Sequence, residues 1–155
     1  MPEEWRRDDY RISTDPALID LDVVHGYLVR SYWSARVTRD VVARSIEHSL
    51  SFGLYTDGTQ IGFARVITDY ATIGYLADVF VLEEYRGRKL AVWLVETVMS
   101  HPRLQNLRVF RLGTRDAHSL YEKVGFRRLA HPDRMMEITS PDLYAGDDSA
   151  GDPGW

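Results

Sequence analysis

The sequence predicts a single α/β domain, in which about four helices flank a central sheet of six to seven strands. Segments with apolar residues at helical spacing alternate with period-two segments in the order β-α-α-β-β-β-α-β-α-β-β. A length of 155 residues and a hydrophobic content of 45% suit one domain with a sizeable core. We expect this domain over residues 1–140. The end of the chain, AGDDSAGDPGW, is small, acidic and rich in Gly and Pro, so a flexible tail is expected over 141–155.

The first half of the chain is expected to contribute two helices and three strands. In order, these are a short strand at 10–13, a helix capped by Asp20 or Asp22 that runs to about Tyr32, a helix capped by Thr38, a strand starting at Leu50, and a strand at 61–68. The dipeptide Asp57-Gly58 between the last two strands is typical of a tight hairpin turn. Residues 69–72 predict a second short reversal.

The second half alternates strand and helix before a final hairpin. In order, we expect a central strand at 73–82, a helix at 89–100 that stops before Pro102, a strand at 109–112, a helix capped by Thr114 or Asp116, and strands at 126–129 and 135–138. Gly125 suits the left-handed position that ends the last helix. The closing pair of strands is expected to finish the sheet.

Composition excludes several classes of function. A net charge of −4 and a pI near 5.7 disfavour binding to nucleic acid or anionic membranes, so any anion site must be local. No apolar run is long enough to span a bilayer and the N-terminus lacks a signal-peptide core, so a cytoplasmic protein is expected. The chain has no cysteine, and none of its five histidines pair at helical spacing, so no metal site is expected.

Residues 79–92, VFVLEEYRGRKLAV, predict a pyrophosphate site. A β-rich run ends in a short basic loop that itself opens an apolar helix. Backbone amides at a helix start have no intrahelical acceptor and lie at the positive end of the helix dipole, so they can bind an anion. Gly87 gives access to these amides, and Arg86, Arg88 and Lys89 add positive charge. The alternative is a solvated basic turn before an ordinary helix.

This loop resembles the Q/R-x-x-G-x-G/A acyl-CoA loop of the GNAT N-acetyltransferase superfamily. A second segment, TRDAHSLYEKVGF at 114–126, resembles the N-x-x-A-x-x-L-Y-E-x-x-G-F segment of that family. The resemblance covers residues 12–138 and implies the GNAT fold, with a mixed, mostly antiparallel sheet; TDYATIGYLADVFV and RDAHSLY look most like a bacterial branch. Two positions depart from the pattern, because Lys89 replaces Gly and Thr114 replaces Asn. We expect Lys89 in the first helical turn at an ordinary negative φ, with its ammonium beside the pyrophosphate.

The resemblance also implies a set of residues that bind acetyl-CoA. The strand before the loop would splay from its parallel neighbour and offer backbone groups to the pantetheine amides. The expected cofactor-binding residues are Val79, Phe80, Val81, Arg86, Gly87, Arg88, Lys89, Leu90, Ala91, Val92, Thr114 and His118. For Val79 to Val81 the alternative is a plain buried strand, and for His118 it is a packing or capping role.

Two residues are candidates for the chemistry. Tyr121 matches the family tyrosine whose hydroxyl can protonate the leaving thiolate, although a packed helix tyrosine is the alternative. Asp78 lies in an otherwise apolar strand, where an ionised carboxylate is costly unless it faces a wet cleft or pairs with a cation. It is either the base for the acceptor amine or the partner of Arg65 in a salt bridge. Tyr32, Trp33 and Tyr70 are candidates for the wall of the acceptor pocket, with core packing as the alternative.

The predicted function is acetyl transfer from acetyl-CoA to a primary amine of a small molecule, or of a peptide. Without cysteine to carry the acetyl group, transfer is expected to be direct within a ternary complex. The alternative from another class is a CoA-binding regulatory or scaffold protein without turnover, to which the changes at Lys89 and Thr114 point. The expected partners are the amine and, if the protein is not a monomer, a second copy in a homodimer.

Overall fold

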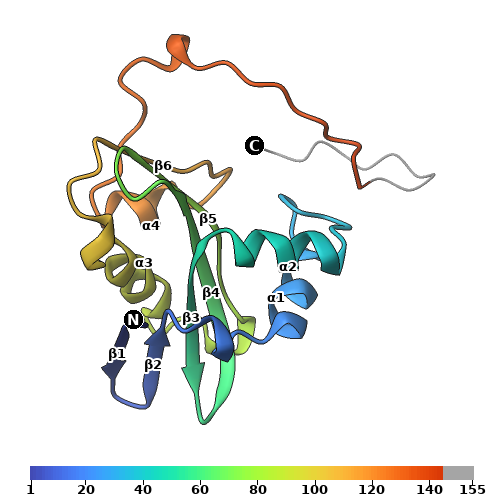
Figure 1. Ribbon diagram of the computed structural model, residues 1–155, viewed down its shortest axis with the longest axis vertical. Helices are drawn as coiled ribbons and strands as arrows, with labels where there is room; N and C mark the ends of the chain where they lie inside the picture. Colours follow the sequence, from blue (N-terminus) through green and yellow to red (C-terminus); the bar gives the residue numbers. More distant parts are fainter. Residues whose placement is uncertain (145–155) are drawn as a thin grey trace.

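The computed structural model describes residues 1–144, and within them six strands form one sheet (Figure 1). The strands are β1 (Glu4–Arg7), β2 (Tyr10–Ser13), β3 (Leu50–Thr56), β4 (Thr59–Thr68), β5 (Ile73–Val81) and β6 (Val109–Arg111). They lie side by side in chain order. Every neighbouring pair is antiparallel except β5 and β6, which are parallel. The predicted mixed, mostly antiparallel sheet is therefore confirmed.

Four α-helices of the described chain flank this sheet, as predicted. They are α1 (Leu21–Leu28), α2 (Arg39–Glu47), α3 (Leu90–Ser100) and α4 (His118–Glu122). Helices α1 and α2 lie on one side of the sheet, and α3 lies on the other with α4 beside it (Figure 1). Short 3-10 turns cover Pro16–Leu18, Glu83–Tyr85, Pro102–Leu104 and Pro132–Arg134. None of the described helices has the length and apolar character needed to cross a membrane.

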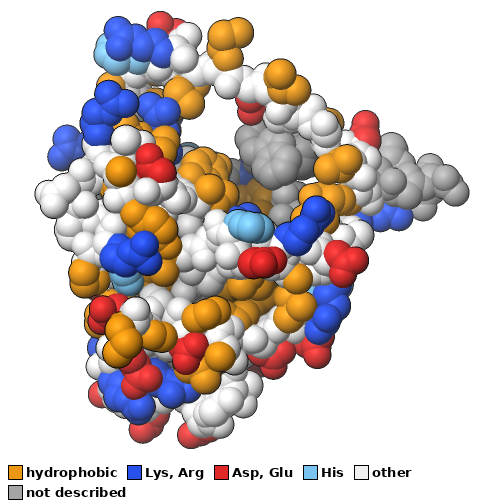
Figure 2. All heavy atoms as spheres, in the orientation of Figure 1, with side chains coloured by type: hydrophobic (Ala, Val, Ile, Leu, Met, Phe, Trp, Pro, Cys, Tyr) orange, Lys and Arg blue, Asp and Glu red, His pale blue; other side chains and the backbone are white. Residues whose placement is uncertain are grey.

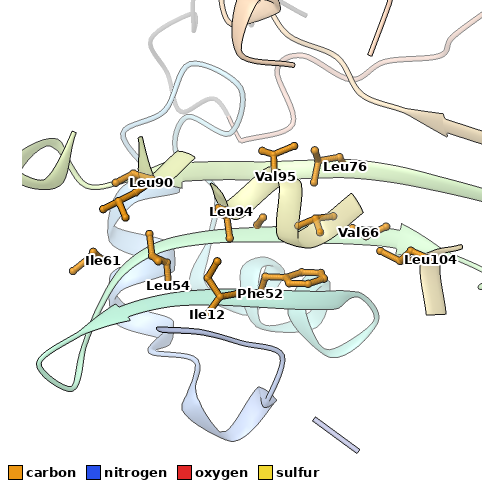
Figure 3. Close-up of a cluster of buried hydrophobic side chains, with 13 residues drawn as sticks. Ile12, Phe52, Leu54, Ile61, Val66, Leu76, Leu90, Leu94, Val95 and Leu104 are labelled. Atoms are coloured by element: carbon orange, nitrogen blue, oxygen red, sulfur yellow. The ribbon is translucent and has the colours of Figure 1, made fainter. Parts of the chain in front are cut away.

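The core consists of two clusters, one on each face of the sheet. The larger cluster packs α3 residues such as Leu94 and Val95 against Phe52, Leu54 and Val66 of the strands (Figure 3). The smaller cluster joins α1 and α2 to the opposite face; it is made of Val24, Leu28, Val37, Val42, Phe63 and Phe80. Because β4 contributes to both clusters, it fixes the position of β5 and of the loop that follows β5.

Side-chain caps start the first two helices where the sequence predicts. Asp20 accepts hydrogen bonds from the amides of Asp22 and Val23, at 3.0 and 3.3 Å, and Thr38 accepts one from Val41 at 3.4 Å. Helix α1 ends at Leu28, earlier than the expected Tyr32. The Ser31 hydroxyl donates to the Leu28 carbonyl at 2.7 Å and accepts from the Ser34 amide, so this local bonding replaces further helix.

The sheet differs from the prediction at both of its edges. Strand β1 was not predicted, because EWRR has no period-two apolar pattern. The expected closing hairpin at 126–129 and 135–138 is wrong for this structure, in which the segment has no strand and is almost entirely exposed. An apolar period-two segment becomes a strand only if its backbone can hydrogen-bond to the edge strand of a sheet. Within the described chain, this segment pairs with no strand of the sheet. Residues 145–155 of the predicted tail lie outside the described residues.

Candidate active site

A β-bulge in β5 places Asp78 at the centre of the candidate site. Phe63 pairs with Phe80 and Arg65 pairs with Ala77, so two residues of β5, Asp78 and Val79, lie opposite one residue of β4. Asp78 has a φ of 54°. Aspartate tolerates this left-handed conformation better than most residues, and such a bulge re-aims the side chain of the strand.

The Asp78 carboxylate is held on both of its oxygens. Oδ2 accepts from Arg65 Nε at 2.5 Å, and Oδ1 accepts from the Trp33 indole at 2.9 Å. The side chains of Asp78 and Arg65 are only 7% and 16% exposed, and Arg65 also donates to the Ser49 hydroxyl at 3.1 Å. The salt bridge expected as the alternative to a base is therefore present. A carboxylate has about four lone-pair sites, so these two bonds leave acceptor capacity for a further donor.

Strand β5 separates from β6 after only three paired residues. The parallel pairing joins Ile73, Gly74 and Tyr75 to β6, and within the described residues Leu76 to Val81 have no partner on that side. On the other side, Phe80 and Val81 still pair with β4. The expected splay is therefore present, and on the side of β6 it leaves backbone groups of the predicted pantetheine strand, 79–81, without a strand partner.

The loop after β5 presents a run of unpaired amides. In the described chain, no backbone carbonyl accepts from the amides of residues 87–92; the Trp93 amide is the first to find one, on Lys89 at 3.2 Å. Gly87 has a φ of 79° and Lys89 has a φ of 63°. Successive amides that alternate through left-handed residues before a helix form a concave anion site. The predicted pyrophosphate residues 86–92 are thus placed together.

Lys89 is not in the first helical turn, and the expected negative φ is wrong. It is the N-cap of α3, in the left-handed region at φ 63° and ψ 20°, and its side chain makes no capping hydrogen bond. A residue with a Cβ is strained in this left-handed conformation, whereas Gly is not. The conformation therefore explains why the family motif has Gly at the position of Lys89.

Two tyrosines that the sequence analysis did not single out for the site hold the arginines of the loop. Arg86 donates to the Val81 carbonyl at 3.2 Å and to the Tyr27 hydroxyl at 2.9 Å. Tyr27 in turn stacks on Phe80, with ring centroids 4.0 Å apart. Arg88 donates to the Tyr10 hydroxyl at 2.7 Å. Both contacts join segments far apart in the chain, so no local sequence signal could have found them.

Tyr121 lies on α4 with its ring edge-on to Phe126. Burial raises the pKa of its phenol to about 12, and the nearby Tyr32 adds to the rise. The hydroxyl therefore keeps its proton across the physiological range and can act as a donor. Helix α4 ends at Glu122, and Gly125 follows three residues later at φ 102°, so Gly125 is left-handed as expected but lies beyond the cap of the helix. The helix starts later than expected, with Ala117 as N-cap, while the Thr114 hydroxyl accepts from the Ala117 amide at 3.0 Å.

The loop between α1 and α2 brings two of the predicted pocket residues to the site. Trp33 bonds Asp78, and Tyr32 meets the Trp33 ring edge-on at 5.1 Å. The Tyr32 hydroxyl accepts from the Arg115 amide at 3.2 Å, which ties this loop to the segment before α4.

Tyr70 lies apart from Tyr32 and Trp33, in the turn between β4 and β5, with the Arg103 guanidinium 3.7 Å from the centre of its ring. His118 is the exposed first residue of α4.

Similarity to known proteins shows the family of the chain. The model of the acetyltransferase (GNAT) family matches residues 4–126. The chain belongs to the GNAT family. A candidate acetyltransferase from Gibberella zeae is 30% identical over 89% of this chain and 90% of its own length.

Solved structures of GNAT fold extend the comparison. A crystal structure of a candidate GNAT acetyltransferase from Xanthomonas campestris is 46% identical, with a TM-score of 0.86 over 88% of this chain and 97% of that one. A candidate acetyltransferase from Clostridium acetobutylicum, solved with acetyl-CoA, is 14% identical and has a TM-score of 0.64 over 90% of this chain and 96% of that one. The second likeness concerns the fold alone.

Proposed function

We propose that the protein transfers the acetyl group of acetyl-CoA to a primary amine of a small molecule, or of a peptide. The observation that carries this proposal is the run of unpaired amides at 87–92, which directly follows a strand with one open edge. The amides suit the pyrophosphate of CoA, and the backbone of residues 79–81 suits the amides of pantetheine. Acetyl-CoA supplies the activated thioester, and the remaining steps fall to side chains of the chain.

Tyr121 is proposed as the donor to the leaving sulfur. Its phenol has a pKa raised to about 12 by burial, so it is neutral and holds the proton that a departing thiolate needs. Burial would also raise the pKa of the CoA thiol held beside Tyr121. The pKa values of the phenol and of the departing thiol would therefore lie closer together. Thr114, which lies four residues before α4, and His118, the first residue of α4, are proposed to border the cofactor.

Asp78 is proposed to receive the acceptor amine. An ammonium must lose a proton before it attacks the thioester, and a carboxylate is the group that attracts it. The spare lone pairs of Asp78 can accept an N–H while Arg65 and Trp33 hold the carboxylate in place. Tyr32 and Trp33 are proposed as walls of the acceptor pocket.

The proposal is tested by turnover with a panel of primary amines, followed through thiol release. Tyr121→Phe should bind acetyl-CoA as tightly as the parent in calorimetry and turn over more slowly by roughly 10² or more. Tyr55→Phe is the matched control, since burial also raises the pKa of Tyr55 to about 12, and its hydroxyl has no hydrogen-bond partner among residues 1–144. It should keep the parent rate.

The alternative, a CoA-binding protein without turnover, has its own signature. Acetyl-CoA would raise the melting temperature by mass action, while no amine would release thiol above the hydrolysis background. If neither acetyl-CoA nor CoA at millimolar concentration shifts the melting curve, both proposals fail together. Equal rates for Tyr121→Phe and Tyr55→Phe would remove Tyr121 from the mechanism.

A further inference from the structure

A partly buried arginine lies at the point where β5 and β6 separate. Arg111 is the last residue of β6 and pairs with Tyr75, after which β5 has no partner on that side within the described chain. Arg111 is only partly exposed, and among residues 1–144 its guanidinium takes part in no hydrogen bond, ion pair or ring contact. A cation that loses some of its water without gaining a partner is costly, so this arginine indicates a site for an anion.

The strand register places Arg111 on the face of the sheet that α1 and α2 cover further along. Phe63 of β4 packs under these helices, and the period of two puts Arg65 and Ile67 on the same face. Ile67 pairs with Tyr75, and Tyr75 pairs with Arg111. These three side chains therefore form one row across β4, β5 and β6.

The Asp78 carboxylate lies close to this row. Arg65 pairs with Ala77 in the adjacent row, and its guanidinium binds Asp78. Three residues along β5 and one strand spacing lie between Asp78 and Arg111, so their Cα atoms are about 10 Å apart. Because side chains stand roughly perpendicular to a sheet, we expect the carboxylate and the guanidinium at a similar separation.

Tyr75 offers a second donor beside Arg111. A Cβ at Gly113 would lie 3.3 Å from the Tyr75 hydroxyl, so this hydroxyl reaches the backbone that follows β6. It forms no hydrogen bond with any group of the described chain. A guanidinium fork beside a phenol hydroxyl suits a carboxylate, which can accept two parallel N–H bonds and one O–H bond.

We propose that the acceptor is an α-amino acid, whose ammonium lies at Asp78 and whose carboxylate is bound by Arg111 and Tyr75. This inference rests on the proposed function, because it names the class of amine that the same site takes. The nitrogen and the carboxylate of an α-amino acid are joined through one carbon. With a hydrogen bond of about 3 Å at each end, the array spans about 10 Å, which matches the separation of Asp78 and Arg111. An amine without a carboxylate would leave Arg111 unpaired.

The surface around Tyr75 suits an apolar side chain on this amino acid. Ile67 and Ile73 lie on the same face as Tyr75, and the three residues are 45%, 40% and 42% exposed. Figure 2 shows hydrophobic side chains beside an opening between the body of the molecule and the segment that follows α4. Leucine is therefore a suitable probe.

The first test compares L-leucine, L-leucinamide and 3-methylbutylamine, which differ only at the carboxylate. With acetyl-CoA and the parent protein, we expect kcat/KM for leucine to exceed the other two values by roughly 10², the scale of charge-assisted hydrogen bonds. Arg111→Met should lose about that factor on leucine alone, and Arg111→Lys should recover part of it, because lysine keeps the charge without the fork. Arg108→Met is the matched control, an exposed arginine just before β6, and should keep the parent values.

Calorimetry of leucine with the CoA-loaded protein gives a second readout that needs no turnover. We expect the parent and Arg108→Met to bind leucine equally, and Arg111→Met to bind it at least tenfold more weakly. If 3-methylbutylamine turns over as well as leucine, or if Arg111→Met slows all three amines alike, this inference fails while the proposed function stands. If leucine binds through Arg111 but no amine releases thiol, the amino-acid site stands and acetyl transfer fails. Absence of both leucine binding and leucine turnover overturns the inference.

Discussion

Replacement of Lys89 by Gly should stabilise the protein, although Gly usually weakens a helix. Lys89 has a φ of 63°, a left-handed conformation that costs a residue with a side chain about 1–2 kcal/mol. Gly removes that strain but makes the unfolded chain more flexible, which costs about 0.4–1 kcal/mol. The net gain in the free energy of unfolding is then about 0.5–1 kcal/mol, or roughly 2–3 °C in melting temperature for a chain of this size.

Lys89→Ala separates the backbone effect from the effect of charge. Ala loses the ammonium but keeps the Cβ, so its stability should stay within about 0.5 kcal/mol of the parent. The assay is urea unfolding of the three proteins, followed by calorimetry with acetyl-CoA. Equal stability of the Gly and Ala variants would refute the strain argument.

Binding of acetyl-CoA gives an independent readout at the same position. Both variants lose the same positive charge near the unpaired amides, so both should bind more weakly by about 0.5–1 kcal/mol, the scale of an exposed ion pair. The loss should shrink as salt is added. Tighter binding by Lys89→Gly would show instead that the lysine obstructs the loop, which would favour the non-catalytic alternative.

Two further predictions concern Asp78 and His101. Asp78→Asn keeps a residue that tolerates positive φ but leaves the mostly buried Arg65 without its anion, so the free energy of unfolding should fall by about 2–3 kcal/mol in urea. A rate per folded molecule that stays at the parent value would assign Asp78 to structure alone. Burial lowers the pKa of His101, so below pH ~6.5 the unfolded chain binds a proton that the folded chain does not, and stability should fall by up to about 1 kcal/mol per pH unit. His101→Asn retains an acceptor for the Arg103 amide and should remove that part of the slope between pH 8 and 5.5 in urea melts; an unchanged slope would contradict the assignment.

Local signals account for most of the fold and for the loop after β5. The caps at Asp20 and Thr38, the turn at Asp57-Gly58 and the left-handed Gly125 depend on the residue itself and its near neighbours. The loop at 86–92 is also local, because unpaired amides follow wherever a strand runs through a short turn into a helix. These features could therefore be predicted from the order of residues.

Other features depend on segments that meet only in the folded chain. The sequence could not choose between the two roles of Asp78, because the answer depends on Trp33 and Arg65 reaching the bulge from another loop and another strand. The φ of Lys89 also escaped prediction, since tertiary packing of α3 against the sheet imposes a conformation that Lys alone disfavours.

The sequence by itself determined the fold family, the order of the elements and the loop suited to a pyrophosphate, because each depends on residues within one or two turns of chain. Only the tertiary structure decided how the Asp78 carboxylate is held and why Tyr121 keeps its proton. It also decided that the segment of the expected closing hairpin forms no strand and stays exposed. Those outcomes depend on burial and on the availability of a partner edge. Both are properties of the space around a residue, which distant segments of the chain create.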